Sequence, residues 1–266
     1  MTPLTPEPVT DQWPNCRRVV VLGASNVTLA LPLIIDLIRS GFAGPLQLDI
    51  GDSHGRSYGQ WTTIPFRSVP GHLESEIWAP ENPASGPVHA IVTDVGNDLV
   101  YDNSVDQTTE WVQQCVESLR EQRSEIVMTG LPLSSIEALG PWRYRLFKTM
   151  FFPGCRLSLD EIRSRAIDLN DRVAAIATAA DAQLLEQPSS WFGFDPIHVA
   201  RRQREIAWRQ ILGGLTDWRP ATKFAPSPLR QKLRYWLAKP QRFRRFGKVR
   251  ESHRCYGDES TRIRFF

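Results

Sequence analysis

Cysteines are few in this sequence, and long apolar runs are missing. Among its 266 residues, four widely separated cysteines form no C-x-x-C pair: Cys16, Cys115, Cys155 and Cys255. This spacing provides neither a disulfide framework nor a thiolate site for zinc, so we expect free thiols and no metal. The most apolar stretches, 19–22 and 29–38, are too short to cross a bilayer. The sequence therefore predicts no transmembrane helix.

The first residues also lack the features of a secretory signal. Residues 1–8 read MTPLTPEP, with neither a basic start nor an apolar centre. We therefore expect a cytoplasmic protein. Four prolines within the first fourteen residues predict an extended leader over 1–15.

Charge is distributed unevenly along a chain of otherwise ordinary globular composition. Apolar residues make up 41% and charged residues 23%, which suits a hydrophobic core and argues against intrinsic disorder. The net charge is +3, but residues 219–266 contain 14 Lys and Arg against 3 Asp and Glu. That segment therefore carries +11 and the rest of the chain −8. We expect an acidic domain over 16–218 and a basic C-terminal extension over 219–266.

Short apolar strands alternate with amphipathic helices along the domain. The β-branched run at 17–22 is typical of a strand buried on both faces, and the apolar spacing over 29–38 places one helical face after it. Further strands are expected at 46–50, 88–95, 125–129 and 182–186, with helices at 105–122, 159–179 and 199–212. This alternation predicts an α/β fold, with a parallel sheet of five strands and helices on both faces.

Polar residues suited to acyl transfer follow several of these strands. Ser25 follows the first strand, a glycine-rich loop over 51–59 follows the second, and Asn97 follows the third. Asp195 and His198 follow the fifth. Because parallel strands end at one edge of the sheet, we expect these residues to meet there. They offer a nucleophile, a base with its orienting carboxylate, and donors for an oxyanion.

These blocks resemble the four signature blocks of the SGNH (GDSL-like) hydrolase superfamily. The matching residues are Gly23-Ala24-Ser25-Asn26, a glycine in the second loop, Gly96-Asn97-Asp98, and Asp195-x-x-His198. Their order and spacing match over residues 17–212. The resemblance implies a three-layer, flavodoxin-like fold with the sheet order 2-1-3-4-5. It also implies a serine esterase that needs no cofactor and no metal.

The resemblance implies a role for each matching residue. Ser25 is the nucleophile, His198 the general base, and Asp195 the carboxylate that orients the imidazole. The oxyanion hole consists of the Ser25 backbone N–H, a glycine N–H and the Asn97 amide. For that glycine we choose Gly55, because it lies a few residues past the strand end; Gly51 and Gly59 are the alternatives.

The sequence departs from the family pattern at one position and leaves structural alternatives at others. Ala24 stands where the family often has an acidic residue before the serine. Taken singly, Ser25 suits a helix N-cap, Asn97 a strand-ending turn, and His198 a structural histidine. Three matches in order, each at a strand end, favour catalysis over these readings.

Other residues near the motifs are substrate-pocket candidates. Arg56 and Tyr58 lie in the second loop, where an exposed turn is the alternative. Trp191 and Phe194 precede Asp195, and packing of this loop onto the core is their alternative. Residues 142–152 suit either a cap over the site or an ordinary amphipathic helix. In the second loop, His54 competes with His198 as the base, but no carboxylate stands at the matching offset.

We therefore expect a serine esterase or acyl hydrolase that cleaves a small ester through a covalent acyl-enzyme. Its substrate class is a carboxylic ester, an acetylated sugar or a lipid-like ester. The alternative is a catalytically degenerate SGNH-like binding protein whose basic tail engages a membrane or nucleic acid.

An apolar stripe lies within the basic extension, at Leu229, Leu233, Trp236 and Leu237. Contact of this stripe with a membrane surface or with nucleic acid is one interpretation. We favour packing of the extension on the acidic domain, with residues 257–266 ending as a short strand or hairpin.

Overall fold

The computed structural model describes residues 16–64, 67–79, 86–221, 226–252 and 254–266. The expected leader over 1–15 lies outside these residues. Within the described ranges, no helix is both long and apolar enough to cross a membrane.

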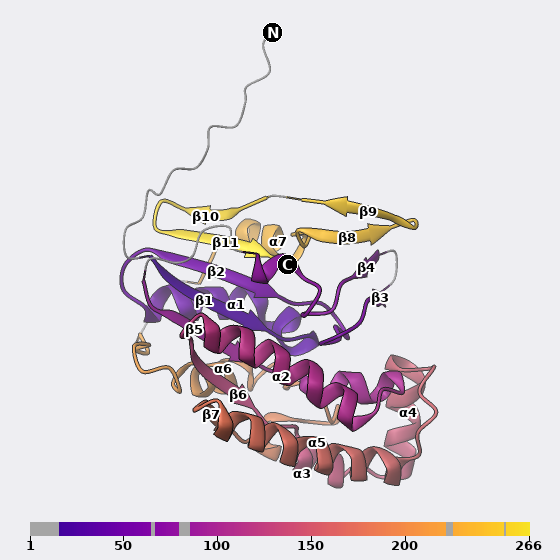
Figure 1. Ribbon diagram of the computed structural model, residues 1–266. Helices are drawn as coiled ribbons and strands as arrows, with labels where there is room; N and C mark the ends of the chain where they lie inside the picture. Colours follow the sequence, from indigo (N-terminus) through magenta and orange to yellow (C-terminus); the bar gives the residue numbers. More distant parts are fainter. Residues whose placement is uncertain (1–15, 65–66, 80–85, 222–225, 253) are drawn as a thin grey trace.

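A seven-stranded sheet in the order β10-β11-β2-β1-β5-β6-β7 forms the centre of the molecule (Figure 1). The five strands expected from the sequence lie side by side and parallel: β2 (Leu46–Gly51), β1 (Arg17–Leu22), β5 (Val88–Val92), β6 (Glu125–Thr129) and β7 (Gln183–Leu185). The expectation of only five strands is wrong, because the C-terminal extension adds two more. β11 (Thr261–Phe265) pairs parallel with β2, and β10 (Tyr256–Asp258) pairs antiparallel with β11.

Helices cover both faces of this sheet, as the alternation predicted. Val19 and Val21 of β1 share one buried cluster with residues of α1 (Ser25–Gly41) and α6 (Arg204–Leu212). Val20 and Leu22 share the other with α2 (Val105–Glu121) and α5 (Leu159–Ala179). Successive strand side chains point to opposite faces, so β1 contributes to both core layers. α6 begins at Arg204 rather than at 199, because residues 201–203 form a turn.

The third expected strand, 88–95, is shorter in the structure. β5 ends at Val92, and Asp94 adopts a left-handed backbone with a φ of 60°. The chain then forms the 3-10 helix η2 (Val95–Tyr101). This bend brings the Asp94 carboxylate to the backbone N–H groups of Ala24 and Asn26, just past the end of β1.

A second sheet, which the sequence analysis did not predict, joins the extension to two short strands that follow the second loop. Its order is β3 (Thr62–Ile64), β4 (Arg67–Val69), β8 (Arg242–Arg245) and β9 (Lys248–Glu251). Phe246 and Gly247 connect β8 to β9 with positive φ values of 51° and 74°, as a two-residue type I′ hairpin requires. The extension is therefore part of the fold rather than an appendage.

The remaining helices are short. They are η1 (Glu76–Trp78), α3 (Leu133–Glu137), α4 (Pro141–Phe151), η3 (Ser189–Trp191) and α7 (Leu229–Trp236). α7 packs against α1 through its buried Tyr235. The expectation that the apolar stripe of the extension packs on the domain is not met. Leu229, Leu233 and Trp236 are 69%, 45% and 50% exposed, because Tyr235 points from the opposite side of the helix.

Candidate active site

Ser25 lies at the first position of α1, directly after a tight turn from β1. A Cβ atom at Gly23 would lie 2.4 Å from Val27 and 2.7 Å from the Thr93 side chain, so this turn requires glycine. The turn places Ser25 at the carboxyl edge of the sheet. The positive end of the α1 dipole at this position favours negative charge that develops on or beside the serine.

His198 connects Ser25 to Asp195 in a chain of two hydrogen bonds. The distance from His198 Nε2 to Ser25 Oγ is 2.9 Å, and that from His198 Nδ1 to Asp195 Oδ2 is 2.6 Å. An ionised Asp195 accepts a hydrogen bond from Nδ1–H of the neutral ring, which leaves Nε2 free to accept a hydrogen bond from the Ser25 hydroxyl. This is the arrangement that serine activation requires.

Asp195 is held ionised by the loop that carries it. Burial alone raises the pKa of Asp195, but the hydrogen bond from His198 and the backbone N–H groups of Ile197 and His198 outweigh burial. The pKa of Asp195 therefore lies below its usual value. Those N–H groups donate to Oδ1 over 3.0 and 3.1 Å, which leaves Oδ2 for the imidazole.

Asn97 and Gly55 share a cleft with Ser25, Asp195 and His198. The side-chain nitrogen of Asn97 is buried and has no hydrogen-bond partner among the described residues. A buried amide donor without a partner is costly, unless a ligand oxygen arrives to accept its proton. The arrangement suits an oxyanion donor.

Gly55 is the glycine of the second loop that lines this cleft. Its φ of 64° is left-handed, and its carbonyl accepts from the Tyr101 hydroxyl over 2.6 Å. Gly51 ends β2, and Gly59 packs so closely on Trp111 that a Cβ there would lie 1.9 Å away. Of these three glycines, Gly55 is the one that lines the cleft, and its role as an oxyanion donor stays a prediction.

Asp94 and Asn26 join the serine turn to the histidine loop, and the sequence analysis assigned no role to either of them. The Asp94 carboxylate accepts the backbone N–H groups of Ala24 and Asn26 over 2.8 and 3.0 Å, and the Asn26 amide over 2.8 Å. The Asn26 amide also donates to Ile197 O and accepts from Val199 N. Ala24 therefore provides no carboxylate, but Asp94 brings one to the same turn from the end of β5.

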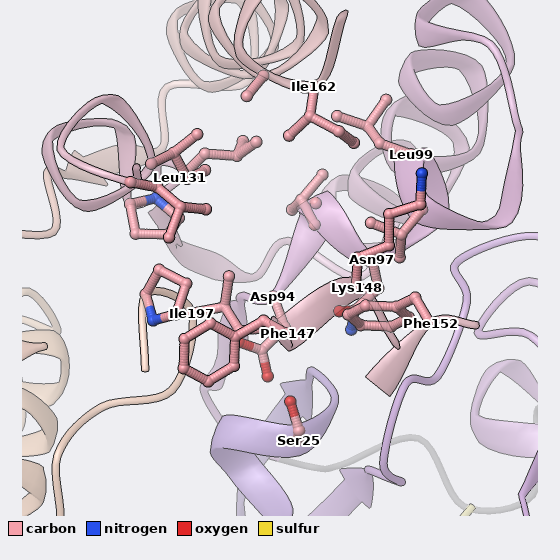
Figure 2. A pocket seen from close by; sticks show the side chains of 18 of the residues that line it. Ser25, Asp94, Asn97, Leu99, Leu131, Phe147, Lys148, Phe152, Ile162 and Ile197 are labelled. Carbon is pink, nitrogen blue, oxygen red and sulfur yellow. The ribbon is translucent and has the colours of Figure 1, made fainter. Parts of the chain in front are cut away.

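Two hollows meet at Ser25 and Asn97. One is an open cleft of about 1000 Å³ that also contains His54, Gly55 and His198. The other is a largely apolar cavity of about 120 Å³, lined by side chains that include Leu99, Leu131, Ile136, Phe147, Phe152 and Ile162. Figure 2 shows the Ser25 hydroxyl directed toward this cavity, with Leu99, Leu131 and Ile162 across from it. Lys148 lines it too, but its ammonium donates to Leu157 O over 2.7 Å.

The four substrate-pocket candidates lie elsewhere. Arg56 is fully buried and donates to the carbonyl oxygens of Pro70 and Phe266, so it holds the C-terminus in place. Tyr58 is buried, with its hydroxyl bonded to Thr93 O over 2.7 Å. Trp191 is buried in the core cluster of α1 and α6. These three placements do not support substrate contact.

Phe194 and His54 lie near the site without joining it directly. Phe194 is 56% exposed and packs on α4 beside Trp142 and Phe147, outside both hollows. His54 lines the cleft, and burial, followed by the nearby His198, lowers its pKa. The imidazole bonded to Ser25 belongs to His198. α4 contributes Met150 and Phe151 to the cleft, so residues 142–152 do border the site.

Comparison with known proteins places this geometry in a known fold. No family model and no curated protein matches the sequence. Among solved structures, an acetyl xylan esterase superposes with a TM-score of 0.50 at 10% identity, over 74% of this chain and 99% of that one. A GDSL-like lipase from Bacteroides thetaiotaomicron gives 0.48 at 12% identity, over 74% and 89%. A carbohydrate acetylesterase family member from Sinorhizobium meliloti gives 0.45 at 13% identity, over 74% and 99%. The superposition at a TM-score of 0.50 shows that this chain shares its overall fold with that acetyl xylan esterase.

Proposed function

We propose that the protein is a serine esterase that cleaves esters of apolar acyl chains through a covalent acyl-enzyme. The observation that carries this proposal is the hydrogen-bonded chain from Asp195 through His198 to Ser25, with distances of 2.6 and 2.9 Å. Nucleophile and base are already within reach of each other, so no rearrangement of these groups precedes attack.

The proposed reaction has two halves with balanced proton transfers. Ser25 Oγ bonds to the ester carbonyl carbon while its proton moves to His198 Nε2, and the carbonyl oxygen becomes an oxyanion. The Asn97 amide and the N–H groups of Ser25 and Gly55 donate to that oxyanion. As the C–O bond to the alcohol breaks, the leaving oxygen takes the proton from Nε2. A water molecule then repeats these steps on the acyl-enzyme and releases the acid.

The apolar cavity supports an acyl chain rather than an acetyl group as the preferred acyl part. It begins at Ser25 and Asn97, where the carbonyl would lie, and its walls are mostly hydrocarbon. Each methylene that enters such a cavity adds about 0.8 kcal/mol of favourable burial. The open cleft on the other side of Ser25 suits the alcohol part, because it is larger and reaches solvent.

Labelling with a fluorophosphonate tests the nucleophile. Ser25→Ala and His198→Ala should abolish labelling, whereas Ser40→Ala, a change on the same helix outside both hollows, should leave it intact. Ester turnover across acyl chains from acetyl to decanoyl then tests the substrate class, and kcat/KM should rise with chain length until the cavity is filled. An unlabelled wild-type chain would instead favour the catalytically degenerate binding protein. Turnover fastest with acetyl esters would retain the esterase and remove the acyl-chain assignment.

A further inference from the structure

α7 presents an apolar stripe to solvent, although it is anchored firmly to the domain. Tyr235 is buried, and Ser227 just before the helix donates to Asp36 of α1 from its backbone N–H over 2.9 Å and from its hydroxyl over 2.5 Å. The outward side carries Leu229, Leu233 and Trp236. Their spacing of four and three residues places them on one line along the helix. The anchored side therefore fixes the direction in which the apolar side faces.

Positive charge surrounds this stripe. Residues 227–251 include nine Arg and Lys against one acidic residue, Glu251. On α7, Arg230 and Lys232 come from positions on the two flanks of the stripe, about 100° and 60° around the helix from Leu229. A helix with an apolar face flanked by basic residues has the composition of helices that lie in a membrane interface.

The β8–β9 hairpin, which follows α7 in the sequence, also combines exposed basic and aromatic side chains. One hollow is lined by four cations, Lys239, Arg245, Arg250 and Arg254, against a single carboxylate, Glu251, and by the rings of Phe243 and Phe246. Phe246 stands at the hairpin turn and is 83% exposed. An exposed aromatic ring beside four cations suits contact with anionic headgroups, in which the ring enters the interface and the cations meet phosphate or carboxylate groups.

We propose that α7 and the β8–β9 hairpin, residues 227–251, dock the protein on an anionic lipid surface. Leu229, Leu233 and Trp236 enter the boundary between headgroups and acyl chains, and the basic residues hold the anionic headgroups. Nucleic acid fits this surface less well, because phosphate contacts would leave the aliphatic stripe in water. This inference does not depend on esterase activity.

Vesicle flotation with the full chain tests the docking surface. The vesicles are phosphatidylcholine alone, or phosphatidylcholine with about one third phosphatidylserine. The wild-type protein should bind the anionic vesicles and dissociate as salt is raised, with little binding to phosphatidylcholine alone. The variant Leu233→Ser/Trp236→Ser keeps every charge and should lose at least about tenfold in affinity. Arg230→Gln/Lys232→Gln keeps the stripe and should lose about thirtyfold.

Matched controls distinguish binding through this surface from nonspecific adsorption of the protein to vesicles. Ile167→Ser/Ile206→Ser removes two apolar residues of comparable exposure, 42% and 50%, outside the surface. Arg120→Gln/Arg202→Gln removes two exposed cations elsewhere. Both control variants should bind vesicles as the wild type does. Thermal unfolding, measured for every variant, shows whether each chain is folded, and this readout does not depend on esterase activity.

Three results would overturn the proposal. The first is a wild-type protein that does not float with anionic vesicles, or a set of variants that all float as the wild type does. The second is tighter binding to a duplex oligonucleotide than to vesicles, unchanged in Leu233→Ser/Trp236→Ser, which would assign the surface to nucleic acid. The third is a wild-type dimer in solution that the same variant converts to a monomer, which would assign the stripe to a second copy of this chain.

Discussion

Asn26 occupies a central position among the individual residues of the site. One side-chain amide group contacts the Asp94 carboxylate, Ile197 O and Val199 N, and so it spans the serine turn and the histidine loop. A misplacement of about 1 Å between reacting groups costs up to about 10²-fold in rate. Residues that keep Ser25 and His198 in register are therefore expected to affect turnover without touching substrate.

Asp94 should act as such a positioning residue. Asp94→Ala removes the acceptor of three N–H donors around Ser25, and we expect kcat to fall by up to about 10²-fold with KM little changed. Asp94→Asn retains one acceptor oxygen and should lose less. The rate of fluorophosphonate labelling checks the result independently of any ester, and Asp106→Asn on the exposed start of α2 is the control. Equal labelling by all of these variants would contradict the positioning role.

Asn97 should act on the transition state instead. Its buried amide donor has no partner among the described residues, so it gains one only when an oxygen enters the site. Asn97→Ala should lower kcat by roughly 10²–10³-fold and leave KM nearly unchanged. Asn103→Ala is a matched control, because the Asn103 amide nitrogen is also buried, has no partner in the part of the chain that the structure describes, and lies outside both hollows. A change confined to KM would make Asn97 a ligand of the ground-state substrate.

Much of the chain's element pattern could be predicted, because it depends on local periodicity. The long helix over 159–179 was predicted with the bounds that α5 has, and Ser158 and Glu161 close its start in a capping box. The shortening of β5 could not be predicted from the sequence. Asp94 has a left-handed φ, and its carboxylate contacts the serine turn, which is distant in the sequence. The strands β3, β4, β8 and β9 are three or four residues long, too short to give a period.

The cavity beside Ser25 is likewise a product of packing between elements. Its walls come from η2, α3, α4 and α5, which are far apart in the sequence, and each wall residue alone resembles an ordinary core residue. No pattern in the sequence distinguishes a leucine that lines a cavity from one that fills a core. The motif residues at strand ends could be found because their positions follow from parallel topology. The pocket candidates Arg56 and Tyr58 lie in the second loop, but parallel topology does not fix where the side chains of that loop point.

Filling the cavity from α5 should change acyl-chain selectivity. Ala166 lines it, so Ala166→Leu should lower kcat/KM for octanoyl esters relative to acetyl esters by about tenfold or more. Ala177→Leu, on the same helix and equally buried but outside the cavity, is the control for overpacking. Ala177→Leu inserts atoms into a packed core and should cost about 1–3 kcal/mol of stability, whereas Ala166→Leu grows into empty space and should cost less. An unchanged ratio of the two turnovers in Ala166→Leu would mean that the acyl chain lies elsewhere.

At the scale of the whole molecule, the C-terminal extension packs into the core of the domain. Ile263 and Phe265 of β11 are buried in the same core cluster as α1, and Arg56 holds the Phe266 carbonyl. The sequence indicated attraction between an acidic domain and a basic extension. In the structure, the buried carboxylate of Asp49 on β2 lies between Arg18 of β1 and Arg264 of β11 and so joins the extension to the domain. This contact could not be predicted, because strand pairing over more than two hundred residues leaves no local signal.

That contact should make Arg264 a large contributor to stability. Burial alone raises the pKa of Asp49, but Arg264 and Arg18 outweigh it and hold the pKa below its usual value. Arg264 donates to both Asp49 oxygens over 2.7 Å, so Arg264→Met leaves a buried carboxylate with Arg18 as its remaining charged partner. We expect a loss near the lower end of about 3–5 kcal/mol in the free energy of unfolding, measured by urea denaturation at neutral pH.

The loss of stability in Arg264→Met should depend on pH, in a direction set by the lowered pKa of Asp49. A carboxylate with a lowered folded-state pKa stabilises the wild type above its unfolded pKa of about 3.9, and that stability is lost as the pH falls. In Arg264→Met, protonation of Asp49 removes the buried charge that has lost its Arg264 partner. The difference in the free energy of unfolding between variant and wild type should therefore shrink below about pH 4. Asp49→Asn/Arg264→Met should recover part of the loss, and Arg262→Met, two residues away on β11, should cost little. A loss that is the same at every pH and in the double variant would mean that Arg264 contributes packing rather than charge.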